Sequence, residues 1–430
     1  MAAPTAAFRL RSSPDARRIV RARGLRALID GLVAVILPGY LLATGLDTVQ
    51  VGAVITATLL GSSAVTLGIG LRGGAVPRRL LLQVIAVAMV VTGIAFASLE
   101  GFVVLLVVAA LGTINPSSGD VSGFLPVEQA LLPDTVPSTN RTSVFARYSL
   151  IASLAGAFGA LAAGLPEVVA RRTDLSVHDA QRGVFLLYAV IGGVLLLQYR
   201  HLSVGASHPI DQPPSRLGPS RSLVYRLAGI FSVDALGGGF AVQSILVLWL
   251  SLRFDLSTVT SGAVFFWSGV LSASSALLAP RLAKRIGLIR TMVFTHLPAN
   301  LLLMAAALMP DAGLAVACLL ARSLLSQMDV PARTSYVMAV VRPEERAAAA
   351  SVTNVPRSLA AALPPLAAGW MLDHSTFGWP LLIAGALKAG YDLALLALFR
   401  DIRPEEELAA SPDGPSGSVL GSPDGTDLIS

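Results

Sequence analysis

The chain has 430 residues, of which 54% are hydrophobic and only 13% are charged, and its mean hydropathy is +0.70. One soluble core cannot hide so much apolar surface, so the composition excludes an ordinary water-soluble protein and predicts that lipid covers the chain. The pI of about 9.9 comes from arginines between apolar segments, and no soluble basic domain is present, so we expect no nucleic-acid partner.

Apolar stretches of roughly 20 residues, each long enough to cross a hydrocarbon layer of about 30 Å, follow one another about twelve times. They are expected at 27–45, 50–70, 79–98, 102–132, 142–164, 182–200, 226–250, 259–280, 288–308, 312–341, 347–371 and 379–399. Strands of a β-barrel would be shorter and would alternate in polarity. The prediction is an all-α membrane protein whose helices satisfy their own backbone groups.

The second half of the chain repeats landmarks of the first at one constant shift. The pairs are Pro126–Glu128 with Pro331–Arg333, Arg141 with Arg346, and Leu161–Gly164 with Leu366–Gly369. Two similar halves in lipid are typical of secondary transporters, which bind substrate near the midplane between the repeats. We predict five parts: a basic tail (1–25), a six-helix bundle (26–200), a linker (201–225), a second six-helix bundle (226–402) and a disordered tail (403–430).

Basic residues gather at the amino terminus and in alternate connections, which predicts that both termini are cytoplasmic. The opposite connections contain few basic residues, Arg171, Arg172 and Arg253 being the exceptions. An organelle transit peptide is an alternative interpretation of the arginine-rich start. The single cysteine, Cys318, lies inside a predicted span and excludes disulfides and a cysteine metal site.

Residues 26–79 contain a series of landmarks, namely Asp30, Leu37-Pro38, Gly45, Val51-Gly52 and Arg78-Arg79. Together they resemble the opening of a major facilitator superfamily transporter. The loop after the second span keeps Gly70, Arg78 and Arg79 of the family's motif, but Gly74 replaces its Asp and Pro77 its second Gly. The second copy keeps Leu282, Arg285 and Gly287 and has Lys284 at the acidic position. The resemblance covers nearly the whole chain and implies two six-helix bundles, alternating access and no cofactor.

The fifth span keeps the small-residue spacing of the family's antiporter motif without its proline. The small residues are Ala155, Gly159, Ala160, Ala163 and Gly164. Ordinary close packing of helices explains the same spacing equally well. The motif therefore favours export only modestly.

Span ten contains Arg322, Ser326, Asp329, Arg333 and Tyr336 at helical spacing, which predicts one continuous polar stripe. The resemblance implies that spans one, four, seven and ten line the central cavity. Arg322 is then a candidate contact for a substrate or an anion. Asp329 and Arg333 form either a cytoplasmic gate or a structural ion pair.

Span four is the symmetric partner, with Asn115 and Asp120 near mid-depth and Glu128 toward the cytoplasmic mouth. Glu128 and Arg333 occupy equivalent positions with opposite charge, so one hypothesis is a cytoplasmic salt bridge across the two halves that breaks when the cavity opens inward. The alternative is local pairing, of Glu128 with Arg147 or Arg141 and of Arg333 with Asp329.

Asp234 in span seven is the best candidate for a proton carrier, and Asp120 is the second. Either aspartate instead stays ionised if it lies beside Arg322 or Arg357. Gln243 and Arg357 complete the predicted substrate cavity, which also contains Asn115, Asp120, Asp234 and Arg322.

Other charged residues have simpler interpretations. Lys388 and Asp392 lie four apart on span twelve and suggest a buried structural pair. His296 is expected to pack at a helix kink, and Asp30 to join a cytoplasmic network near Arg26.

The sequence thus predicts a monomeric transporter, not an enzyme, that exports a small organic solute in exchange for protons. Its expected location is a bacterial inner membrane. An importer or uniporter of the same fold is the first alternative. A membrane sensor or an intramembrane aspartyl protease is the second, the latter on Ser118-Gly119-Asp120 and Tyr391-Asp392.

Overall fold

The computed structural model describes residues 13–72, 76–117, 122–137, 140–203, 217–342 and 345–399, and within these ranges it is built from helices without strands. Nine of the described segments are long and apolar enough to cross a membrane. Large apolar side chains such as Val103, Leu111 and Val190 are exposed on the outside of the molecule. This outer surface suits lipid, and the chain is an integral membrane protein.

The described part of the first half contains eight α-helices. They are α1 (Pro14–Ala43), α2 (Thr48–Arg72), α3 (Arg78–Ser98), α4 (Phe102–Leu111), α5 (Phe124–Leu131), α6 (Arg141–Leu161), α7 (Leu165–Arg172) and α8 (Val177–Arg200). The second half contains α9 (Arg221–Phe240), α10 (Gln243–Phe254), α11 (Thr258–Ile286), α12 (Leu288–Leu308), α13 (Ala312–Ser323), α14 (Asp329–Val340), α15 (Arg346–Ala362), α16 (Pro364–His374) and α17 (Trp379–Phe399).

Each of the twelve expected spans coincides with one of these helices or with a consecutive pair. The pairs are α4 with α5, α9 with α10, α13 with α14 and α15 with α16, and α7 extends the span of α6 beyond its expected end at residue 164. The first span is longer than expected. α1 begins at Pro14, where the Ser13 hydroxyl accepts a hydrogen bond from the Ala16 amide at 3.1 Å. This N-cap places the arginines of residues 17–23 on a helix, where the sequence suggested a tail.

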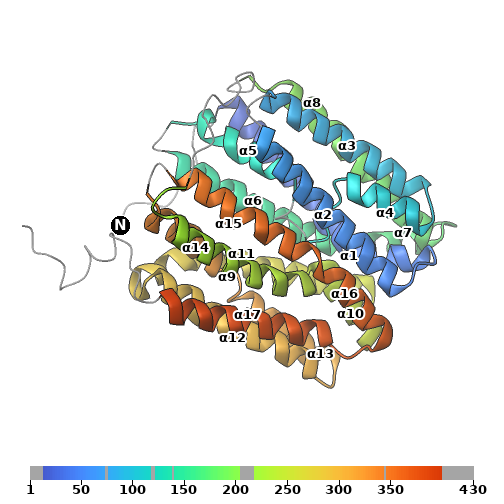
Figure 1. Ribbon diagram of the computed structural model, residues 1–430. Helices are drawn as coiled ribbons and strands as arrows, with labels where there is room; N and C mark the ends of the chain where they lie inside the picture. The colour runs from blue at the N-terminus through green and yellow to red at the C-terminus, as the bar shows by residue number, and fades with distance from the viewer. Residues whose placement is uncertain are drawn as a thin grey trace, which may run out of the picture.

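The two halves pack their helices in the same way. α1 packs against α6 and α3 against α8 in the first half, and α9 against α15 and α12 against α17 in the second. In span numbers, contacts 1–5 and 3–6 recur as 7–11 and 9–12. Figure 1 shows the blue-to-green helices of the first half on one side of the molecule and most of the yellow-to-red helices on the other. The structure is therefore two pseudo-symmetric bundles of six spans.

Small residues bring α1 and α6 into backbone contact. A Cβ atom at Gly31 would collide with the carbonyl of Gly156, and one at Gly159 would collide with the carbonyl of Leu28. Gly159 belongs to the small-residue motif of span five. Its role in this structure is the close packing of two helices within one half.

The two halves meet mainly on the side of the molecule where α1 ends. We call this side the far side, and we call the opposite side, where α1 begins, the N side. α2 packs against α16 and α6 against α11. The Thr48 hydroxyl donates to Asp373 at 2.7 Å, and the Leu366 amide donates to the Thr56 hydroxyl at 2.9 Å. At mid-depth, the Ser244 hydroxyl donates to the Ala34 carbonyl at 2.8 Å.

On the N side, the following ion pair and hydrogen bonds each lie within one half. Arg78 pairs with Asp134 at 3.2 Å in the first half. In the second half, Glu345 accepts hydrogen bonds from the amides of Gly218 and Ser220, and bonding to Ser220 holds the pKa of Glu345 below its ordinary value. The contacts between the halves thus seal the far side.

Two alanine substitutions on α2 test the glycine contact in this seal. A Cβ at Gly52 would collide with the carbonyl of Pro365, whereas a Cβ at Gly68 meets nothing within 4 Å. We expect Gly52→Ala to destabilise the purified protein by about 1–3 kcal/mol through overpacking. Gly68→Ala should stabilise it by about 0.5–1 kcal/mol through helix propensity.

The measurement is the loss of monodisperse protein in detergent on heating. A melting temperature that rises equally in both variants would contradict the close approach of α2 to α16.

Candidate functional site

Spans four and ten are both interrupted near their middle. α4 ends at Leu111 and α5 begins at Phe124, while α13 ends at Ser323 and α14 begins at Asp329. Residues 124 and 329 are related by the shift that relates the other repeated landmarks. Interrupted spans at equivalent places in the two halves expose backbone groups inside the protein and commonly mark a binding site.

The interruption of span ten corrects one expectation. Arg322 lies at the end of α13, whereas Asp329, Arg333 and Tyr336 lie on α14. These residues therefore do not form one continuous helical stripe. The periodicity suggested one because residues 324–328 contain neither proline nor glycine to signal the break.

Glu128 on α5 is the centre of a buried network in the first half. Its oxygens accept hydrogen bonds from the Arg26 guanidinium at 2.7 and 3.0 Å, from Tyr148 at 2.5 Å and from Tyr199 at 2.6 Å. Arg26 also lies over the ring of Phe124. The network joins α1, α5, α6 and α8, so it fixes spans one, four, five and six to each other.

This network corrects the local hypothesis for Glu128, whose partner is Arg26. The bridge to Arg333 was expected to break when the cavity opens toward the cytoplasm, so it stays a prediction for the state that is closed on that side. In the present conformation Glu128 pairs neither with Arg333 of the other half nor with Arg147 or Arg141, because Arg26 already occupies both of its oxygens. Arg147 is partly buried and has contacts of its own.

Asp234 on α9 is the centre of the network in the second half. Its oxygens contact Lys388 Nζ at 2.6 Å, Arg333 Nη1 at 3.1 Å, His296 Nε2 at 3.8 Å and Arg357 Nη2 at 3.9 Å. Only 3% of Asp234 is exposed. The contacts come from α17, α14, α12 and α15, so Asp234 joins span seven to four other spans.

Two other buried carboxylates of this half, Asp329 and Asp392, also have partners. Asp329 pairs with Arg333 at 3.1 Å, as expected for a local ion pair. Asp392 accepts hydrogen bonds from His296 Nδ1 and Asn300 Nδ2, each at 2.9 Å. The expected pair of Lys388 with Asp392 is wrong, because Lys388 reaches α9 while Asp392 faces α12. His296 likewise does more than pack at a kink.

The two networks are related by the repeat with their charges inverted. Arg26 of span one binds Glu128 of span four, and Asp234 of span seven binds Arg333 of span ten. Spans one and seven are equivalent, as are spans four and ten, and Glu128 and Arg333 occupy equivalent positions. Each half therefore fixes its first and fourth spans with one buried ion pair.

The remaining predicted cavity residues lie near the interruptions and have unused polar atoms. The Asn115 carbonyl oxygen accepts from the Ser117 amide at 3.0 Å, but its Nδ2 has no partner in the described part of the chain. Gln243 Nε2, Arg322 Nε and Arg357 Nε are also buried and without an acceptor among the described residues. Asp120 lies outside the described residues.

Asp30 on α1 is a feature that the sequence did not identify as functional. It is 1% exposed, and in the described ranges neither carboxylate oxygen has a hydrogen-bond partner. The charges of Arg26 and Arg23 act on Asp30, and the Asn115 side chain lies beside its carboxylate. The sequence signal was an acidic residue inside an apolar helix. Asp30 resembled a residue near the helix end, because the span was expected to begin at residue 27 and α1 in fact begins at Pro14.

The loop motif residues take ordinary structural positions. Gly70 lies in α2, and Arg79 follows Arg78 at the start of α3. Arg78 donates hydrogen bonds to the carbonyl of Ala130 and to the carboxylate of Asp134. Asp134 is thus a carboxylate partner for Arg78 in a loop whose motif lacks its usual aspartate. Arg285 is in the last turn of α11, and Gly287 has a φ of 85°, which permits the sharp turn into α12.

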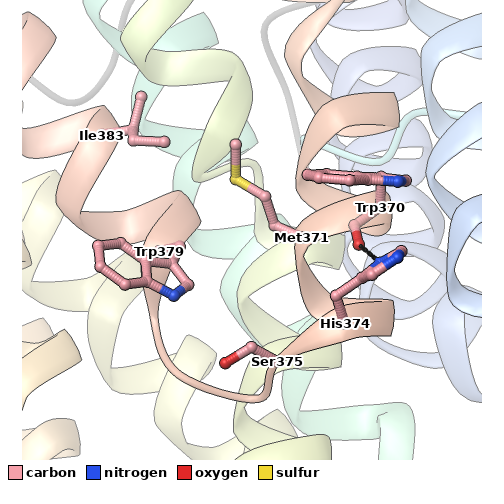
Figure 2. Close-up of a pocket in the computed structure, with 6 residues that line it drawn as sticks. All are labelled: Trp370, Met371, His374, Ser375, Trp379 and Ile383. Carbon is pink, nitrogen blue, oxygen red and sulfur yellow. Dashed lines mark hydrogen bonds between the residues drawn. The ribbon is translucent and has the colours of Figure 1, made fainter.

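A separate pocket of about 300 Å³ lies between α16 and α17 on the far side. Figure 2 shows that it is lined by Trp370, Met371, His374, Ser375, Trp379 and Ile383. Trp370 and Trp379 are about half exposed, at 54% and 50%. Indole rings at this level are typical of the membrane interface, and the pocket contacts neither buried network.

Two six-span bundles, each with one interrupted span at an equivalent place, are typical of membrane transporters of the alternating-access type. Residues 22–363 match the family model described as Major Facilitator Superfamily, which is most of the chain. The protein belongs to the major facilitator superfamily and is a transporter, not an enzyme.

One curated relative and two solved structures illustrate the similarity. The uncharacterized membrane protein YJR124C of Saccharomyces cerevisiae is 26% identical, over 87% of this chain and 92% of the relative. A bacterial homolog of the human lysosomal transporter Spinster, in an inward-facing and occupied conformation, has a TM-score of 0.69 at 13% identity, covering 90% of this chain and 95% of that one. The nucleoside transporter NupG has a TM-score of 0.67 at 14% identity, covering 90% of this chain and 99% of that one. The two structures share the fold.

A double-mutant cycle tests the Asp234 network. Removing one member of a buried ion pair leaves the other charge uncompensated and costs about 3–5 kcal/mol, whereas replacing both is often neutral. We expect Asp234→Asn and Lys388→Met each to lower the melting temperature sharply, and the double variant to recover part of the loss.

The control is Glu167→Gln, which breaks the exposed pair with Arg171 at 3.8 Å and should change stability by less than about 1 kcal/mol. Strictly additive losses for Asp234 and Lys388 would show that the two side chains do not interact.

Proposed function

We propose that the protein exports a small organic solute in exchange for protons. The solute binds at mid-depth between the halves, near Asn115, Gln243, Arg322 and Arg357. The observation that carries this proposal is the set of unpartnered, buried polar atoms on these four residues, next to interruptions that the two halves share.

The four residues come from spans four, seven, ten and eleven, so they belong to both halves. Leaving a buried donor without an acceptor costs about 1–3 kcal/mol, and a bound solute with acceptor groups offsets that cost. Side chains of Arg322, Gln243 and Arg357 remain partly exposed, which suits contact with a solute that enters and leaves.

Alternating access requires that the halves separate on one side while they remain in contact on the other. The far-side contacts and the internal pairing of each half support rigid-body rocking of this kind. With the N side cytoplasmic, as the arginine distribution favours, the present conformation is inward-facing. The export direction itself rests on the small-residue spacing of span five.

The proton site requires a different residue from the one that the sequence favoured. Both oxygens of Asp234 already bond cations, at 2.6 and 3.1 Å, so a proton would have to displace an ion pair. Asp30 has no such competitor. A bare carboxylate is costly inside a protein, and protonation removes that cost. We therefore assign proton exchange to Asp30.

Asp30 is also well placed to act on the contact between the halves. It lies one helical turn before Ala34, whose carbonyl accepts the hydrogen bond from Ser244 of the other half. Asn115 and Pro116 lie beside the same contact, since the Pro116 carbonyl also accepts from Ser244, at 3.2 Å. Loss or gain of charge on Asp30 thus changes the electrostatics next to an inter-half joint.

Everted membrane vesicles with an acid interior, monitored by a pH-sensitive dye, test this function. Drugs, organic acids, sugars and amino acids are added in turn. We expect at least one solute to dissipate the gradient with the wild type and not with Asp30→Asn. The matched control is Asp174→Asn, an exposed aspartate in a loop, which should behave as the wild type.

Solute movement is measured in the same vesicles with radiolabelled compound. Solute transport without proton movement in the wild type would favour a uniporter. Proton movement in the opposite sense would favour an importer. Coupling that survives Asp30→Asn would exclude Asp30 as the proton site.

A further inference from the structure

The buried charges of the second half do not balance. Four permanent cations and three carboxylates lie in its interior, within the part of the chain that the structure describes. The cations are Arg322, Arg333, Arg357 and Lys388, and the carboxylates are Asp234, Asp329 and Asp392. An excess positive charge inside the membrane is unfavourable unless an anion or water compensates it.

The contacts identify which cations are left without full compensation. Arg333 and Lys388 take the close positions at Asp234, and Arg333 also binds Asp329. Asp392 is occupied by His296 and Asn300. Arg357 only reaches Asp234 at 3.9 Å, and Arg322 has no ion-pair partner within 4.0 Å among the described residues.

Arg322 and Arg357 share one electrostatic neighbour. Arg322 is in the last turn of α13 and Arg357 is on α15. The charge of Asp234 acts on both arginines. The Arg357 side chain is 31% exposed, so its guanidinium is not sealed in the network. The buried Nε of each arginine lacks an acceptor in the described ranges.

The first half has no such excess at its centre, because Arg26 and Glu128 form a two-bond pair that two tyrosines complete. An anionic group that enters between the halves is therefore attracted to the second half. Guanidinium groups bind carboxylate, sulfonate and phosphate oxygens through paired N–H donors, which makes them selective for such oxyanions.

We infer that the transported solute is an organic anion, whose oxyanion group binds between Arg322 and Arg357. This inference rests on the proposed function. An anionic lipid headgroup offers the same chemistry, but the site is at the mid-span interruption and not at the membrane surface. A soluble anion is therefore the occupant.

Matched pairs of compounds test the inference on the full chain in phosphatidylcholine nanodiscs. Benzoate is compared with benzamide, nicotinate with nicotinamide and succinate with succinamide, and benzenesulfonate and tetraethylammonium extend the panel. Binding is measured from the shift in melting temperature as a function of concentration. We expect at least one carboxylate or sulfonate to bind more tightly than its neutral analogue, by about tenfold or more. A difference in affinity of about tenfold is what one charge-assisted hydrogen bond contributes.

Variants then assign the binding to the two arginines. Arg322→Gln and Arg357→Gln should each weaken the anion about tenfold or more and leave any residual binding of the amide unchanged. Arg322→Lys should retain part of the affinity, because it keeps the charge and loses the paired donors. Arg172→Gln, at an exposed position on α7, is the matched control and should bind as the wild type.

The outcomes separate this inference from the proposed function. If a neutral or cationic compound is bound and transported and no anion is, the anion inference fails and the transport function stands. If no compound of any charge is transported in vesicles, both fail. If phosphatidylglycerol in the nanodiscs removes anion binding, the site belongs to lipid and the inference is overturned.

Discussion

The cost of a charge in the membrane governs how this molecule is built. A lone charged side chain at mid-depth costs at least a few kcal/mol, so each buried charge needs a partner that stays with it. Arg26 and Glu128 meet this need in the first half, and Asp234 with Arg333 and Lys388 does so in the second. Because each pairing is internal to one half, it joins four spans of the first half and five of the second into rigid units. Rocking of the halves then breaks no ion pair among those described.

The contacts that do join the halves are of a different kind. They are backbone approaches at glycines, such as Gly52 against Pro365, and single neutral or singly charged hydrogen bonds, such as Thr48 with Asp373 and Ser244 with Ala34. Such contacts are individually weak, so they can form and break at a modest cost in free energy. A cross-half bridge of Glu128 with Arg333 would have placed a stronger bond at this boundary. The observed division of strong bonds within halves and weak bonds between them suits a transporter that must cycle.

The sequence predicted the helices far better than it predicted the pairings. Span positions follow from apolar length, and α12 and α17 have the bounds that hydropathy alone indicates. The break in span four is signalled by Gly112 and Pro116, whereas that in span ten has no such residue and was missed. Partner choice depends on the rotation and depth of each helix, which spacing does not reveal. Lys388 and Asp392 lie one turn apart and still contact different helices. Asp30 was undervalued because its apparent depth depended on where α1 begins.

The inverted charges at equivalent positions explain how two similar halves come to have different roles. The first half needs one ion pair and finds its remaining hydrogen bonds in two tyrosines, so its network is saturated and electrically balanced. The second half has Arg333 where the first has Glu128, and its Asp234 is surrounded by more cations than one carboxylate can neutralise. Its network is therefore saturated at Asp234 and unsaturated at Arg322 and Arg357. If the rigid pairs hold the bundles and the unsaturated arginines bind the solute, then the second half supplies the electrostatic attraction for the solute and the first half supplies the proton site at Asp30. The pseudo-symmetry of the fold is thus preserved in the backbone and broken in the charges.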